Sequence, residues 1–392
     1  MKNSLKIILL ALVLMVLIFS FVIYPVRNSI SEGMNSIYKS ISNGVNKIPL
    51  PKFQKAGLFR IKNELLSSLT ILEKLTIEQK VGQLFIIGFE GKKLDRNLQD
   101  LMEEIQPGGI LLLKRNIKNE KQLKELIEKL QEISIKNTGL PLFVAVDQEG
   151  GEICRVDFLD CLAPSKIKDE KQAFEIGFKR GKDLKEIGIN LNLAPVLDES
   201  SKGDFIFKRT FQKDTEKTAS LAKSFILGQK KARILTAIKH FPGYGGIDFD
   251  PEREKLATFS QMPEIFQFQK AIKAEPEIVM VANALYLEID NDLPFSLSPQ
   301  GIEFLKQKLG EEILIISDDL SSKVLKRKFS LEKTILLAQK AGIDILLVAG
   351  FWDPLDPKRA YNALLQGFQE GEISEEEINK TLLKIIQLKK TL

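Results

Sequence analysis

Short apolar runs alternate with charged segments along most of this chain. The runs are rich in β-branched residues, which is typical of strands buried in a parallel sheet. They cover residues 84–89, 109–113, 142–147, 190–195, 234–241, 277–282, 312–318 and 344–350, and the strand pattern is weakest at 190–195. Apolar residues at helical spacing follow near 94–106, 119–136, 169–187, 213–231, 260–274, 298–309, 330–342 and 357–369.

Eight strand–helix pairs in succession predict an α/β fold, specifically a (β/α)8 barrel of the TIM type. An open doubly wound sheet is the competing architecture. No apolar run is followed by a G-x-G-x-x-G or Walker phosphate loop, and this favours the barrel.

The N-terminus carries a longer apolar segment. Lys2 and Lys6 precede the uncharged stretch 7–24, which as a helix is roughly 27 Å long. That length is close to the hydrocarbon thickness of a bilayer, about 30 Å. We therefore expect a transmembrane signal anchor at 1–24, a stalk or linker at 25–60 and the barrel at 61–392. A cleaved signal peptide is the alternative. On the anchor reading, the barrel is attached to the membrane and lies outside the cytoplasm, in the cell envelope.

The overall composition excludes several classes of function. The 57 basic and 52 acidic residues leave a net charge of +5, without a basic stripe interleaved with aromatics, so no nucleic-acid partner is expected. Cys154 and Cys161 could form a disulfide or remain two thiols, and no zinc-ligand spacing is present. No metal or organic cofactor is expected, and we expect a monomer.

Polar residues gather where the predicted strands end. Asp147, Lys239 with His240, and Asp318 end three different runs, and Asn283 follows a fourth. In addition, Arg155 and Arg209 lie in the loops after the third and fourth runs. Barrel enzymes build their sites at the carboxyl ends of the strands, so these residues are candidates for one site. His240 is the only histidine in the chain, which excludes any mechanism that needs two.

Several motifs, taken in order, resemble glycoside hydrolase family 3, in particular its compact single-domain bacterial β-N-acetylglucosaminidases. The motifs are Val-Gly-Gln-Leu-Phe-Ile-Ile-Gly-Phe (81–89), Gly-Gly-Ile-Leu-Leu-Leu (108–113), Val-Asp-Gln-Glu-Gly-Gly (146–151), Leu-Ala-Pro-Val-Leu-Asp (193–198), Arg-Thr-Phe (209–211), Lys-His-Phe-Pro-Gly (239–243) and Ser-Asp-Asp-Leu (317–320). The resemblance implies a barrel, a retaining mechanism and a terminal β-linked N-acetylglucosamine substrate, typically from peptidoglycan.

The resemblance also implies roles for the candidate residues. Asp318 falls on the family's nucleophile, and its neighbour Asp319 is the alternative. The family's sugar-holding positions are occupied by Asp147, Arg155, Arg209, Lys239 and His240. A carboxylate can accept hydrogen bonds from sugar hydroxyls, and Arg and Lys can donate to ring substituents or to an acetamido oxygen.

The chain departs from the family pattern in the loop after Lys239. The family subgroup has an Asp-x-His pair there, whose histidine is the acid/base; Asp250 keeps the aspartate and Glu252 replaces the histidine. A carboxylic acid can serve this role if its pKa is raised, so Glu252 is the first candidate and Asp250 the second. Asp248 and Glu254, on the same loop, are further candidates.

Three other family positions are changed. Tyr244 replaces an earlier loop histidine, Asn283 stands where another histidine is usual, and Glu152 replaces an arginine. We predict an exo-acting retaining glycoside hydrolase with Asn283 as a further sugar contact. A sugar-binding pseudoenzyme of the same fold, favoured by the missing histidine, is the alternative. Hydrolysis of another β-linked sugar is the third possibility.

Overall fold

The computed structural model describes residues 52–392. The chain is divided into two compact units between Thr70 and Ile71. The helix α3 (Lys52–Lys74) crosses this boundary. The second unit contains all the strands and the remaining helices, and with them every candidate site residue.

The predicted transmembrane helix requires a correction. In the part of the chain that the structure describes, no helix is both long and apolar enough to cross a bilayer. The prediction rested on residues 1–24, and these, like 25–51 of the predicted stalk, lie outside the described residues. The fold is therefore stated without a membrane-spanning helix, and the envelope localisation inferred from that helix is corrected with it.

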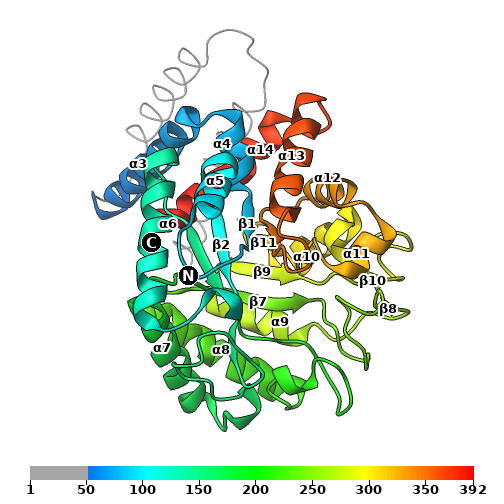
Figure 1. Cartoon of the computed structure of the whole chain (residues 1–392). Coiled ribbons are helices and arrows are strands. Elements are labelled where there is room, and N and C mark those ends of the chain that lie inside the picture. Colours follow the sequence, from blue (N-terminus) through cyan, green and yellow to red (C-terminus); the bar gives the residue numbers. More distant parts are fainter. Residues whose placement is uncertain (1–51) are drawn as a thin grey trace. The chain divides into compact units, whose positions relative to one another are not determined.

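Eight parallel strands form one sheet that curls into a barrel (Figure 1). They follow one another around the barrel in chain order. They are β1 (Phe85–Ile87), β2 (Gly109–Leu112), β3 (Phe143–Val146), β6 (Leu191–Asn192), β7 (Leu235–Phe241), β9 (Ile278–Val281), β11 (Leu314–Ser317) and β12 (Leu346–Val348). A parallel bridge between Ile316 and Ile345 joins β11 to β12 and closes the ring. This is the TIM-type α/β architecture expected from the alternating pattern.

The helices lie outside the strands (Figure 1). They are α4 (Ile77–Gln83), α5 (Arg96–Ile105), α6 (Glu120–Thr138), α7 (Glu170–Glu186), α8 (Thr215–Ala232), α9 (Phe266–Ala271), α10 (Pro299–Leu309), α11 (Lys323–Lys328), α12 (Leu331–Ala341), α13 (Asp356–Gln369) and α14 (Glu375–Lys389). Side-chain oxygens of Asp95, Asn119 and Asp169 accept the first free backbone N–H groups of α5, α6 and α7. Such N-caps explain why these helices begin where the periodicity begins.

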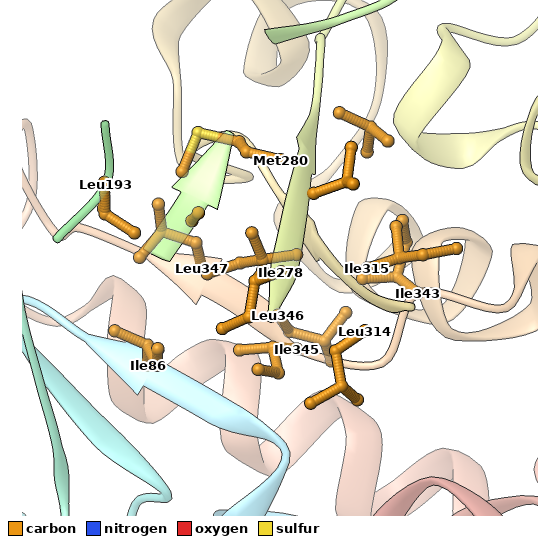
Figure 2. Packing of buried hydrophobic residues seen from close by; sticks show 14 of the residues in the cluster. Ile86, Leu193, Ile278, Met280, Leu314, Ile315, Ile343, Ile345, Leu346 and Leu347 are labelled. Atoms are coloured by element: carbon orange, nitrogen blue, oxygen red, sulfur yellow. The ribbon is translucent and has the colours of Figure 1, made fainter. Parts of the chain in front are cut away.

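Both faces of the barrel strands are buried, which accounts for their continuous apolar sequences. One cluster of buried side chains joins β1, β9, β11 and β12 with the residues that flank them. Figure 2 shows ten labelled members of this cluster: Ile86, Leu193, Ile278, Met280, Leu314, Ile315, Ile343, Ile345, Leu346 and Leu347.

The weakest predicted strand, 190–195, is shorter than expected. Only β6 remains of it, because Pro195 has no N–H group for a ladder. Side-chain bonds replace the ladder: Asn192 accepts from the Gln148 backbone N–H at 3.1 Å and donates to Gln229 at 2.7 Å.

The loop after β3 forms a small hairpin of β4 (Gln148–Gly150) and β5 (Ile153–Cys154). The two cysteines, whose pairing the sequence left open, are joined by a disulfide between Cys154 and Cys161. Arg180 on α7 is buried and donates to the Glu149 carbonyl and the Asp160 carboxylate, both at 2.7 Å. The hairpin is thus fastened from both ends beside the carboxyl end of β3.

Candidate active site

The carboxyl ends of four strands carry the candidate residues. Asp147 follows β3, Lys239 and His240 lie near the end of β7, Asn283 follows β9, and Asp318 follows β11. All strands are parallel, so these residues lie on one face of the barrel, the face where barrel enzymes place their chemistry.

A network of alternating charges occupies the β3–β7 side of this face. Nζ of Lys239 lies 2.7 Å from Oδ1 of Asp147 and 2.7 Å from Oε1 of Glu149. Arg209 binds the same Glu149 through two parallel bonds of 2.9 and 2.8 Å. Arg155 extends the network, with its guanidinium 3.8 Å from Asp147. The Lys239 and Glu149 side chains are almost completely buried, so each depends on its partners for compensation of its charge.

The network favours the charged forms of Asp147, Glu149 and Lys239. Burial alone would raise the pKa of Asp147, but Lys239 and Arg155 lower it to about 2. Burial also opposes the charge of Glu149, whose pKa is nevertheless lowered by Arg209 and Lys239. The pKa of Lys239 is raised: burial would lower it, and Asp147 and Glu149 overcome that effect. This side of the site is therefore a fixed array of charges at neutral pH.

His240 is clamped between two charged groups. Its Nδ1 lies 3.0 Å from Asp198, and its Nε2 lies 3.3 Å from the Arg209 guanidinium. A guanidinium has only donors, so Nε2 accepts and Nδ1–H donates to Asp198. Asp198 also accepts the backbone N–H groups of His240 and Tyr244, at 2.9 and 2.6 Å. This aspartate fixes both the ring and the start of the following loop.

A cluster of carboxyl groups occupies the β11 side. Oδ2 of Asp318 accepts the Tyr244 hydroxyl at 2.8 Å, and its Oδ1 accepts the Asp319 backbone N–H at 2.9 Å. The Tyr244 hydroxyl in turn accepts the Asn283 backbone N–H at 2.6 Å. Among the described residues, Asp318 forms no ion pair with a Lys or Arg side chain. The contrast with Asp147 and Glu149 is direct.

Glu252 completes this cluster. The residue as a whole is half-buried, and its carboxyl group interacts with that of Asp318. Burial of the carboxyl, together with the charges of Asp318 and Asp319, raises the pKa of Glu252 well above its ordinary value. The protonated form of Glu252 is therefore favoured.

Sequence comparison places this barrel in a known family. The family model described as "Glycosyl hydrolase family 3 N terminal domain" matches residues 76–388. The chain belongs to glycosyl hydrolase family 3. A curated beta-hexosaminidase of Idiomarina loihiensis is 28% identical over 322 residues, covering 76% of this chain and 96% of that protein.

Solved structures agree with this assignment. A family 3 β-N-acetylglucosaminidase from Paenibacillus sp. str. FPU-7 has a TM-score of 0.76 and 30% identity over 81% of this chain. This chain spans 62% of that longer protein. A β-N-acetylhexosaminidase from Beutenbergia cavernae has a TM-score of 0.75 and 27% identity, covering 81% of this chain and 99% of that one. The protein is therefore a glycoside hydrolase, similar to the β-N-acetylhexosaminidases of the family.

Some of the predicted site residues of this family 3 enzyme form hydrogen bonds to other parts of the protein. Asp319 points inward, where Oδ1 accepts the Ala349 and Ser321 N–H groups and the Ser321 hydroxyl. The Asn283 amide donates to the Asp319 carbonyl at 2.9 Å and accepts the Ser296 hydroxyl at 2.6 Å. Asp318 and Asp319, which the sequence could not rank by contacts, thus have different environments.

The acidic loop shows a similar division. Asp250 accepts the Glu252 backbone N–H at 2.9 Å and pairs with Arg253 at 3.3 Å, so its carboxylate braces the loop. Glu254 accepts the Asp250 backbone N–H at 3.0 Å, and Asp248 is exposed. Of the loop carboxyls, Glu252 is the one whose pKa the neighbouring Asp318 raises.

Sequence reasoning missed three residues of the site: Glu149, Asp198 and Tyr244. Glu149 and Asp198 lie inside the motifs given above, but the sequence does not show which residues contact them. In the structure, Glu149 contacts Arg209 and Lys239, and Asp198 contacts His240. Tyr244 was noted only as the replacement of a histidine. No sequence signal showed that its hydroxyl reaches Asp318, which lies in a different strand-to-helix loop.

Proposed function

We propose that this enzyme is an exo-acting, retaining β-N-acetylhexosaminidase in which Asp318 is the nucleophile and Glu252 the acid/base. The observation that carries the proposal is the surroundings of Glu252: burial and the charges of Asp318 and Asp319 raise the pKa of this carboxyl well above its ordinary value. A retaining glycosidase needs this pairing of an ionised carboxylate with a protonated acid.

In the first step, Asp318 attacks the anomeric carbon while Glu252 gives its proton to the departing glycosidic oxygen. A covalent bond forms between the sugar and Asp318, and the bond to the aglycone breaks. In the second step, the Glu252 carboxylate takes a proton from water as the oxygen of that water attacks the same carbon. Asp318 leaves, and two inversions give net retention.

The two carboxyls must separate before the sugar can react. Retaining enzymes hold them about 5 to 5.5 Å apart, whereas here the Glu252 carboxyl interacts directly with that of Asp318. The sugar would enter between them, so that the Glu252 proton would face the glycosidic oxygen.

The charged network supports binding of a single terminal sugar. Asp147 keeps lone pairs free beside Lys239 and Arg155, so it can accept from two adjacent hydroxyls. The Nε–H of Arg155 is buried with no hydrogen-bond partner among the described residues, which leaves a donor for a ring substituent or an acetamido oxygen. Contacts through Tyr244, His240 and Arg209 connect this network to Asp318. In this proposal, Asn283 acts mainly by holding Asp319 and Tyr244 in place.

The substrate class is proposed from the relatives, whose names include β-N-acetylglucosaminidases and β-hexosaminidases. We propose terminal β-linked N-acetylglucosamine on peptidoglycan-type fragments. A cation on the loops at the carboxyl ends of the strands supports an acidic aglycone: Lys323, after β11, lies over the Trp352 ring and forms no ion pair with a carboxylate among the described residues. The proposal predicts a higher kcat/KM for a substrate with a carboxylate on the aglycone than for its neutral amide.

Trapping the intermediate tests the nucleophile. A 2-fluoro glycosyl donor with a good leaving group should label the enzyme, because the fluorine slows hydrolysis of the ester. Peptide mass spectrometry should find the sugar on Asp318. Labelling of a different carboxylate would overturn the assignment. Binding of N-acetylglucosamine with neither labelling nor turnover would favour the sugar-binding pseudoenzyme instead.

A further inference from the structure

The loop that carries Glu252 needs a support from outside itself. Arg253, Glu254 and Lys255 are exposed, and the loop contains short turns rather than a helix or strand. Within it, Asp250 accepts the Glu252 backbone N–H. From the first turn of α11, the Val324 N–H donates to the Glu252 carbonyl at 3.3 Å. These bonds hold the backbone, but a backbone bond at one residue does not fix the side chain's distance from Asp318.

Arg253 supplies a further attachment, in addition to the bond that the Arg327 guanidinium donates to the Glu254 carbonyl. Its guanidinium lies 5.4 Å from the ring centre of Phe351 and 5.0 Å from that of Trp352, and its Nε is 3.3 Å from Asp250. The two rings pack edge to face, with their centres 4.6 Å apart. Attraction between a cation and aromatic faces within about 6 Å is favourable even at exposed sites.

The two aromatic residues sit where three loops meet. They follow β12, while Lys323, whose Nζ is 4.1 Å from the Trp352 ring, follows β11. Arg115, after β2, lies 5.6 Å from the Phe351 ring. Phe351 is exposed, so its ring is accessible to the side chains of neighbouring loops. Here its visible role is to seat cations, one of them adjacent in sequence to Glu252.

We infer that Arg253 is a positioning residue for the acid/base, with Phe351 and Trp352 as its seat. The seat sets how far Glu252 stands from Asp318. It is also weak and exposed, so it can yield when the sugar separates the two carboxyls. This inference rests on the proposed role of Glu252.

Kinetics with two kinds of leaving group test the positioning role. Arg253→Ala should lower kcat about 10- to 100-fold on a substrate whose aglycone needs protonation, since small misplacement of a catalytic group has effects of this size. KM should change little, and the glycosylation step of a good-leaving-group substrate should be spared. Arg253→Lys should recover much of the loss, because an ammonium also binds aromatic faces. Lys255→Ala is the matched control: this exposed lysine of the same loop lies over Phe249 and not over the seat.

A double-mutant comparison separates this inference from the proposed function. In a Glu252→Gln background, Arg253→Ala should cause no further loss if it acts only through Glu252. An equal loss in both backgrounds would overturn the positioning role. If Glu252→Gln itself has no effect, the proposed acid/base is wrong. The contact between Arg253 and the two aromatic rings is then tested separately by fluorescence.

Trp352 is the only tryptophan in the chain, so its emission reports on the seat alone. Arg253→Ala should shift the emission, and Lys255→Ala should not. Titration of the unmodified enzyme with N-acetylglucosamine should move the emission toward that of Arg253→Ala, with a much smaller change in the variant. Identical emission from the unmodified enzyme and Arg253→Ala, unmoved by the sugar in both, would overturn the inference.

Discussion

On two sides of the same barrel face, buried carboxyl groups have neighbours of opposite charge. On the β3–β7 side, Asp147 and Glu149 meet Lys239, and every ionised group lies against its opposite. On the β11 side, Glu252 meets Asp318, and the pKa of Glu252 is raised well above its ordinary value. Burial is common to both sides, so the sign of the neighbour decides whether a carboxyl ionises. A rigid charged array suits binding, and a retained proton suits acid catalysis.

The largest expected effect comes from removing the carboxylate on the β11 side. Asp318→Asn should lower kcat by roughly 10⁴- to 10⁶-fold, as expected for loss of a nucleophile. Its stability should not fall, because the amide can still accept from Tyr244 while the charge that disfavours ionised Glu252 is gone. Turnover of an aryl β-N-acetylglucosaminide and thermal unfolding measure the two effects. Unchanged turnover would remove Asp318 from the mechanism.

Removing the protonated partner should have a smaller and more selective effect. Glu252→Gln should lower kcat by about 10²- to 10⁴-fold when the leaving group needs a proton, the range for general acid catalysis. The glycosylation step of an activated aryl substrate should be nearly unaffected. The unmodified enzyme should lose activity as pH rises through the raised pKa of Glu252, and this alkaline limb should vanish in the variant. An exposed helix position, Glu303→Gln, is the control, and equal losses on both substrates would argue against the acid role.

Breaking the paired side should reduce stability. Lys239→Met leaves Asp147 and Glu149 short of a cation, and losing one partner of a buried pair costs about 3 to 5 kcal/mol. Lys80→Met is the matched control, since Lys80 is also buried but pairs with the exposed Glu375. Its pair should contribute at most about 1 kcal/mol. Urea unfolding at pH 7 compares the two variants, and equal losses would mean that the network has no special role.

The smallest expected effect is on how folding stability depends on pH. The sign of this dependence differs between the β3–β7 side and the β11 side. The pKa of Asp147 is about 2 when folded, against about 3.9 unfolded, so the unfolded state binds more protons in between. Stability is then lost as pH falls through this window, by about 2 to 3 kcal/mol for this group. Asp147→Asn should flatten that loss.

Glu252 should show the opposite slope. Its pKa is raised on folding, so the folded state holds a proton that the unfolded state releases above about pH 4.3. Its contribution is therefore unfavourable at neutral pH, and Glu252→Gln should be more stable than the parent there. Urea unfolding at pH 3, 5 and 7 checks both slopes, and slopes of the same sign would contradict the comparison.

The helices and strands were largely predictable from sequence. Periodicity and N-caps such as Asp95 and Asn119 are local features, and the elements they predicted lie within a few residues of those observed. The prediction missed α4, α11 and α14, and also α3, whose first residues it assigned to the stalk. It also missed the β4–β5 hairpin, because its short strands carry no apolar repeat and depend on Gln148 and Arg180 for support. The transmembrane helix was predicted from residues that the structure does not describe, and no described helix replaces it.

The candidate site was predictable in membership but not in contacts. Strand ends and motif order placed Asp147, Lys239 and Asp318 on one face. They could not show that Asp319 turns inward to the Ala349 and Ser321 backbone. At the end of a strand, the side chains of two consecutive residues such as Asp318 and Asp319 point in different directions. Only the packing of the following loop decides which of them faces the site and which faces the interior.

By itself, the order of apolar and polar residues determined the barrel and the end of it that carries the chemistry. Both depend on spacing along the chain, which the sequence contains directly. Only the tertiary structure decided which charges meet: Lys239 with Glu149, Tyr244 with Asp318, and Glu252 with Asp318. Protonation depends on distances between groups far apart in sequence, and folding alone sets those distances.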